Sequence, residues 1–234
     1  MRGVRAYPGQ MPMSPAEFYA HAMKAADADG RLPLSRMAAW EVFPFEQAGL
    51  RAVALARPVL PEPARAGETA ADCPACTAGR VPVWSDEHWR LSVFEPSGTP
   101  LILMLEPQAH YDLPHLPDDR ASEMGLLIVR IAQAIESLPH IARAHVSRWG
   151  DGTAHLHIFF FARPAGFAQL RGTCLALWDD LLPAVPADQR DGDAATIGQA
   201  LAGSYGGQAH PAPQGTRTQA QVNSDPTRSG PADR

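Results

Sequence analysis

The stretch that decides the fold is Ala154-His155-Leu156-His157-Ile158-Phe159-Phe160-Phe161, an apolar segment with two histidines one residue apart. Its aromatic and aliphatic residues predict a strand over 155–161. Side chains two apart on a strand point to the same face, so His155 and His157 are expected to project together. Such a pair can bind a metal, or one imidazole can act as a nucleophile beside a ligand. The HxH pattern alone favours the plainer interpretation, a pair of partly exposed strand histidines.

Strands and amphipathic helices flank this segment on both sides. Strands are predicted at 89–94, 101–105 and 144–147, with a turn at 149–152 before the histidine strand. An apolar stripe indicates a helix that Asp118 or Asp119 can cap. A second apolar stripe indicates a last helix over about 167–181. Strands without a strict βαβ alternation predict an α+β fold with an antiparallel sheet. The first stripe comprises Met124, Leu127, Ile128, Ile131, Ile135 and Leu138.

The ends of the chain differ in composition from this central part. Ser14-Pro15-Ala16-Glu17 is a capping box that opens a helix, expected to stop at Asp29-Gly30. A short hairpin is predicted over 40–45 and 50–55, followed by a proline-rich linker. From Gly203 onward large apolar residues are scarce, which predicts disorder. The expected organisation is an N-terminal extension over 1–71, a main domain over 72–192 and a mostly disordered tail over 193–234.

Composition excludes several classes of function. The 234 residues are 45% hydrophobic and 19% charged, with a formal net charge of −5. That charge argues against nucleic acid as the main partner and against a polybasic membrane surface. No apolar run reaches the ~20 residues of a membrane span, and the N-terminus lacks the apolar core of a secretory signal. A cytoplasmic globular protein is expected.

A second motif is Cys73-Pro74-Ala75-Cys76, followed by Gly79. A tight CxxC turn suits a zinc knuckle, in which two thiolates converge on one ion. The alternative is a thioredoxin-like redox pair, which needs a strand before the cysteines and a helix after them. A proline-rich linker precedes this pair, so the metal site is favoured. Two cysteines supply half of a tetrahedral site, and histidines are the obvious source of the rest.

The order of motifs over about residues 72–165 resembles the histidine triad (HIT) superfamily. After CxxC come two strands, Pro107-x-x-His110, the amphipathic helix and Ala-His-Leu-His-Ile, ending in Phe-Ala-Arg-Pro. The resemblance is to the zinc-containing branch, which is similar to galactose-1-phosphate uridylyltransferases. It implies a structural Zn²⁺ held by four ligands: Cys73, Cys76, His110 and His155.

The same resemblance implies that His157 is the catalytic nucleophile, which attacks the α-phosphorus and forms a nucleotidyl-histidine. Two features depart from the family. Phe159 stands where the third triad histidine belongs, and the loop before the strand lacks the family's Ala-Gly-Gln segment. Arg148 and Arg163 could replace the missing phosphate contacts, and Trp149 could stack a base.

The expected function is hydrolysis or transfer of a nucleotidyl group through His157. The alternative is a zinc-stabilised HIT-fold module that binds nucleotides without catalysis. The expected partner is a nucleotide or a nucleotidylated small molecule, with neither a membrane nor nucleic acid as the main partner. HIT relatives are often homodimers, so the resemblance also implies a homodimer.

Overall fold

A computed structural model describes residues 13–211, which divide into two compact units between Ala64 and Arg65. Each unit is considered by itself. The predicted tail beyond residue 211 lies outside the described residues. Among the helices described, none is long and apolar enough to cross a membrane.

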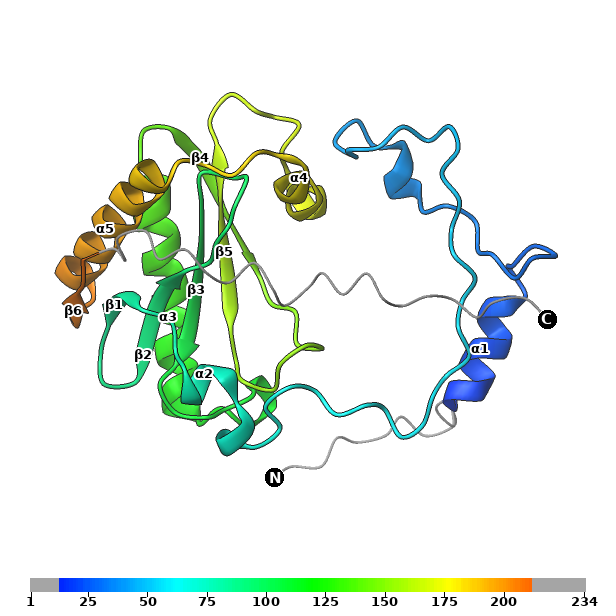
Figure 1. The fold of residues 1–234 in the computed structure, drawn as a ribbon, viewed down its shortest axis with the longest axis horizontal. Helices are drawn as coiled ribbons and strands as arrows, with labels where there is room; N and C mark the ends of the chain where they lie inside the picture. The colour runs from blue at the N-terminus through cyan, green and yellow to red at the C-terminus, as the bar shows by residue number, and fades with distance from the viewer. Residues whose placement is uncertain (1–12, 212–234) are drawn as a thin grey trace. The chain divides into compact units, whose positions relative to one another are not determined.

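The second unit is built on a six-stranded sheet of order β4-β5-β3-β2-β1-β6 (Figure 1). All neighbouring strands pair antiparallel, which confirms the predicted α+β class. The strands are β1 Pro82–Ser85, β2 Trp89–Val93, β3 Leu101–Pro107, β4 Ile141–Ser147, β5 Ile158–Pro164 and β6 Gln208–Ala209.

Helices lie on both faces of this sheet (Figure 1). The long helices α3 (Asp118–Glu136) and α5 (Ala187–Ser204) cover one face, and the short α4 (Leu175–Leu181) covers part of the other. Alternation along β3 explains the two layers, because Leu101, Leu103 and Leu105 join the α3/α5 core. Ile102 instead joins a smaller cluster with Phe161 and Leu175. Short elements complete the unit: η2 Ala70–Asp72, α2 Pro74–Thr77, η3 Leu113–His115 and η4 Gly172–Cys174.

The histidine strand begins later than the sequence predicts. The last β3–β5 pair joins Leu105 to Ile158, so His155 and His157 precede the strand instead of lying on it. Pro107, at the end of β3, has no N–H to extend the ladder. The Leu156 N–H is directed instead to the carbonyl of Tyr111, at 2.7 Å. The segment 155–157 is therefore not paired with β3 in the sheet, and its backbone bonds to the loop at Tyr111.

The first unit contains the helix that the capping box predicts. Helix α1 spans Pro15–Met23, and Ser14 and Glu17 make both reciprocal capping bonds. The helix ends six residues before the expected stop, and a turn closed by the Asp27 carboxylate follows. The hairpin predicted over 40–55 is not formed: η1 (Arg36–Ala39) precedes this stretch, and a single bridge joins Arg31 to Ala54. Pro44, which cannot donate to a ladder, lies inside the first predicted strand.

The tail predicted from residue 193 begins inside α5, and β6 lies further along the same stretch. The sequence hides this helix because its buried face has only two large apolar residues, beside two small residues and one arginine. The buried residues are Arg190, Ala194, Ile197, Gly198 and Leu201. Tyr205 then packs edge-on against the buried Trp84, with ring centroids 5.8 Å apart.

Close contact between α5 and β1 requires a glycine at position 198. A Cβ there would lie 2.4 Å from the Val83 carbonyl oxygen, whereas a Cβ on Gly192 of the same helix meets nothing within 4 Å. We therefore expect Gly198→Ala to lower the free energy of unfolding by about 2 kcal/mol through overpacking. Gly192→Ala should raise it by up to about 1 kcal/mol through helix propensity. Urea denaturation of both variants measures the difference, and equal effects would contradict this packing.

Candidate metal centre

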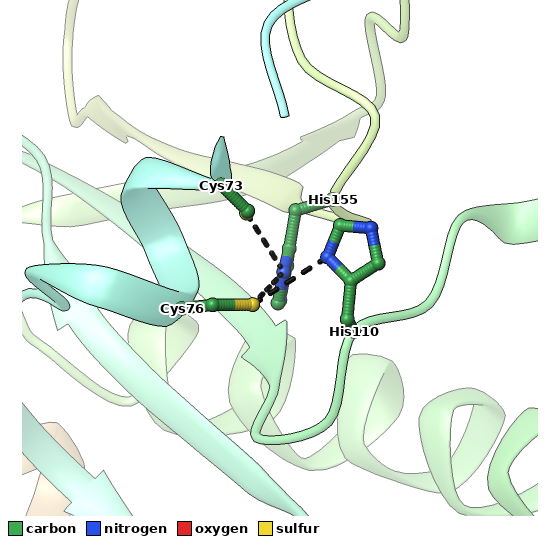
Figure 2. A group of neighbouring side chains, drawn as sticks. All are labelled: Cys73, Cys76, His110 and His155. Atoms are coloured by element: carbon green, nitrogen blue, oxygen red, sulfur yellow. Dashed lines mark hydrogen bonds between the residues drawn. The ribbon is translucent and has the colours of Figure 1, made fainter. Parts of the chain in front are cut away.

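Four predicted ligands converge at one end of the sheet (Figure 2). The ligand atoms of Cys73, Cys76, His110 and His155 all lie within 4.8 Å of one another. Cys73 and His155 are buried, His110 is half-buried and Cys76 is exposed. Among the described residues this is the group of cysteine, histidine and acidic side chains close enough to hold a metal ion.

The two ring nitrogens of His155 have different partners. Nε2 lies 3.0 Å from the Pro107 carbonyl oxygen, which can only accept, so Nε2 carries the proton. Nδ1 therefore has a free lone pair, and it faces the sulfurs of Cys73 at 3.5 Å and Cys76 at 3.4 Å. A metal-binding histidine commonly donates its other N–H to a carbonyl in this way. Burial also lowers the pKa of His155, which favours the neutral imidazole that a metal requires.

The distances between the groups fit a tetrahedral site. With zinc bonds of about 2.3 Å to sulfur and 2.0–2.1 Å to nitrogen, a sulfur and a nitrogen ligand stand about 3.5 Å apart. The three sulfur–nitrogen contacts here measure 3.4–3.5 Å, including Cys76 Sγ to His110 Nδ1. Burial and the neighbouring Cys73 raise the pKa of the Cys76 thiol, and a bound cation would favour its ionisation. Two thiols and two imidazoles form a donor set suited to Zn²⁺.

Backbone geometry holds the cysteines in place. Cys73 caps α2, and its carbonyl accepts from the Cys76 and Thr77 N–H groups at 3.0 and 2.9 Å. Gly67, with φ of +70°, passes so close that a Cβ would stand 2.9 Å from the Cys73 Cα. Arg90 on β2 donates to the Ala75 carbonyl at 2.7 Å and pairs with the buried Glu106 at 3.2 Å. Arg90 thus connects the turn between the two cysteines to strands β2 and β3.

The redox alternative finds little support in this geometry. Helix α2 has four residues, and β1 follows the cysteines instead of preceding them. Both sulfurs also contact histidine nitrogens, which a redox pair does not need. The arrangement favours metal binding.

His157 lies beside the metal centre but outside it. Its Nδ1 lies 2.8 Å from the His155 carbonyl, so Nδ1 carries the proton and Nε2 has the free lone pair. The ring is half-buried and packs edge-on against Phe159 at 5.3 Å. Phe159 in turn contacts Phe94, Trp149 and Phe161. The third triad position is therefore part of an aromatic cluster.

The two arginines predicted to bind phosphate are placed differently. Arg148 pairs with Asp112 at 2.6 Å, and Asp112 also pairs with Arg65 at 2.8 Å. Burial alone would raise the pKa of Asp112, but the bond from Arg65 and the charge of Arg148 bring it below its usual value. Arg163 lies six residues beyond His157, about 20 Å along an extended chain, and donates to the Phe167 carbonyl. The structure does not bring Arg163 to His157.

Sequence reasoning missed three contributors to this region. The Pro107 carbonyl and the Arg65–Asp112 pair have no sequence signal, because a backbone acceptor and a contact across 47 residues carry no motif. His145, on the strand next to β5, pairs in register with Phe161. It therefore lies further along the sheet from His157.

Among known proteins, this chain resembles solved structures in fold, without a match by sequence to a family model or a curated protein. Solved histidine triad proteins resemble this chain. A zinc-bound member from Mycobacterium smegmatis is 19% identical, with a TM-score of 0.42, over 58% of this chain and 96% of that one.

Two further structures illustrate the range of matches. A hypothetical histidine triad nucleotide-binding protein from Sulfolobus tokodaii strain 7 is 11% identical over 57% of this chain and 95% of its own, with a TM-score of 0.42. A uridylyltransferase mutant is 20% identical over 51% of this chain and 42% of its own, with a TM-score of 0.36. These likenesses concern the fold alone, so the site is argued from its own residues.

Metal analysis tests the four-ligand centre directly. Purified, untagged protein should hold about one zinc ion per chain. Cys73→Ser should lose the metal and several kcal/mol of unfolding free energy, because binding energy at such a site is folding energy. Cys174→Ala is the matched control, since this buried cysteine lies outside the ligand group and the variant should keep the zinc. Wild-type protein free of metal after growth with zinc would contradict the site.

Proposed function

We propose that the protein hydrolyses or transfers a nucleotidyl group through a covalent intermediate on His157. The observation that carries the proposal is the bond from His157 Nδ1 to the His155 carbonyl. It fixes the tautomer in which Nε2 has the free lone pair, and a half-buried position leaves the ring partly open to solvent. A neutral imidazole with a positioned lone pair is a competent nucleophile near neutral pH.

The proposed reaction has two displacements at phosphorus. The Nε2 lone pair attacks the α-phosphorus, forming an N–P bond while the P–O bond to the leaving group breaks. Water or an acceptor phosphate then attacks the same phosphorus, and the N–P bond returns its electrons to Nε2. The Nδ1–H bond to the fixed carbonyl orients the ring through both steps.

The proposed role of zinc is structural. Four protein ligands close the site and leave no position for a metal-bound water. The metal would hold the Cys73–Cys76 knuckle against His155, whose carbonyl in turn orients His157. The His157 side chain is not part of the ligand group.

A zinc-stabilised binding module without catalysis is the second candidate. Two observations favour it: Phe159 offers phosphate no hydrogen bond, and the Arg148 guanidinium is engaged by Asp112. In that case the protein would bind a nucleotide and release it unchanged. The homodimer implied by the family resemblance remains a prediction, as does a cytoplasmic location.

Substitution of His157 separates the two candidates. His157→Ala should lower turnover of dinucleotides or nucleoside phosphoramidates by about a thousandfold or more, because the nucleophile is lost. Its zinc content and thermal stability should match those of wild type. His155→Ala should lose both zinc and stability, because a metal ligand is removed. Turnover assays, elemental analysis and mass spectrometry for a nucleotidyl adduct measure these effects.

His115→Ala provides the control, since this exposed histidine on η3 lies outside the metal group and should leave all three measurements unchanged. An adduct mapped to His157 would establish catalysis. Nucleotide binding with neither adduct nor product, across adenylyl and uridylyl substrates, would overturn the catalytic proposal and leave the binding module.

A further inference from the structure

An ion pair outside the ligand group joins the chain segments that carry the metal ligands. Arg65 lies on the segment that precedes the two cysteines. Its Nη1 donates to the Asp112 carboxylate at 2.8 Å and to the Gly150 carbonyl at 2.9 Å. Asp112 lies two residues after the ligand His110. Gly150 lies in the loop that leads to His155. One nitrogen atom therefore connects the three segments from which all four ligands come.

The backbone next to this arginine makes the same connection. The Ala66 N–H donates to the Gly152 carbonyl at 3.1 Å, and the Ala66 carbonyl accepts from the Ala154 N–H at 3.0 Å. The next residue is Gly67, whose close approach to the Cys73 backbone leaves no room for a Cβ. This short segment therefore lies between the first cysteine and the loop of the second histidine ligand.

The carboxylate that receives Arg65 is shielded from solvent. The Asp112 side chain is 10% exposed, and it also pairs with Arg148 at 2.6 Å. An ion pair in such a position is screened less by salt than one on the surface, and its hydrogen bonds are of the short, charge-assisted kind. Arg148 belongs to the same loop as Gly150, so its bond to Asp112 joins the two histidine segments but not the cysteine segment.

This connection matters because the ligands come from separate segments. A site of this kind loses its metal when one ligand after another moves away from the ion. Residues outside the ligand group that fix the ligands oppose that movement, and substituting such residues costs about 10–100-fold in metal affinity. Arg90 holds the turn that follows Cys73, through its bond to the Ala75 carbonyl. Arg65 holds the segment that precedes Cys73.

We propose that Arg65 is a positioning residue of the metal centre. It keeps the segment that carries the cysteines against the loops that carry His110 and His155, and so slows loss of the metal. This role rests on zinc binding by the four ligands. It does not depend on catalysis at His157, because it holds equally for the nucleotidyl-transferring enzyme and for the binding module.

The rate of zinc loss from the folded, full-length protein tests this role. Zinc-loaded protein is mixed with an excess of a chromogenic zinc chelator, and the change in colour records the release. Arg65→Met keeps the length of the side chain but removes its charge and donors, so zinc loss should be roughly tenfold or more faster than in wild type. Arg65→Lys should lose zinc more slowly than Arg65→Met, because an ammonium group can donate to the same two acceptors.

Gly198→Ala and Arg51→Ala are the matched controls. The first is expected to lower global stability at the contact between α5 and β1, outside the ligand group. The second removes one arginine from an exposed ion pair of the first unit. Both should lose zinc at the wild-type rate, and thermal melts give the stability of each variant. Equal acceleration in Gly198→Ala and Arg65→Met would show that zinc loss follows global stability, and would overturn the positioning role.

A second variant keeps the test decisive if Arg65→Met does not fold. Asp112→Asn keeps the shape of the acceptor but removes its charge, and it should also speed zinc loss. Where both variants fold, the double variant should show less than the product of the two single effects, because both substitutions weaken the same bond. Zinc loss at the wild-type rate in every variant of this pair that folds, or two effects that multiply, would overturn the proposal.

The outcomes also separate this proposal from the proposed function. Wild-type protein without zinc would overturn the metal centre and the role of Arg65 together. Zinc loss that depends on Arg65, without any adduct on wild-type His157, would support the positioning role and overturn catalysis. An adduct on His157 with zinc loss indifferent to Arg65 would overturn the positioning role and support catalysis.

Discussion

The imidazole of His155 connects three separate parts of the chain. Its Nε2 donates to the Pro107 carbonyl at the end of β3, and its Nδ1 faces two sulfurs of the knuckle that follows the first unit. The side chain is only 1% exposed, so each nitrogen left without a partner would cost about 1–3 kcal/mol. The ring therefore has one favourable orientation, and the backbone of 155–157 is held with it.

That fixed backbone determines the state of the neighbouring histidine. The His155 carbonyl accepts from His157 Nδ1, so the same residue that faces the metal centre with its side chain orients His157 with its main chain. Two histidines two residues apart thus differ in chemistry because a carbonyl group holds Nε2 of His155 but Nδ1 of His157. On the proposed reaction, zinc would influence the nucleophile through the backbone of His155 and without contacting His157.

The sequence was informative where side-chain patterns determine structure. The stripe from Met124 to Leu138 predicted α3, and the capping box predicted the start of α1. Cys73, Cys76, His110 and His155 were proposed as a group and do converge. Side-chain patterns did not predict the features that depend on backbone hydrogen bonding and on close contact between elements. Pro107 ends the ladder and moves the start of β5. Helix α5 buries only two large apolar residues, beside Ala194, Gly198 and Arg190, so its apolar stripe is weak. The bonds of Arg65 join segments far apart in the chain, which no local motif encodes.

Phe159 changes the character of the surface next to the proposed nucleophile. A histidine there would hydrogen-bond phosphate, whereas this ring extends an apolar surface through Trp149 to Phe161, beneath α4. Stacking on such a surface is worth about 1–3 kcal/mol per base, comparable to about one hydrogen bond to a charged group. On the proposed function, a ligand at His157 would meet a phenyl ring at position 159 instead of a hydrogen-bond partner. Because ring stacking stabilises ground state and transition state alike, it favours affinity over rate, which is the physical reason that binding and catalysis must be measured separately in this protein.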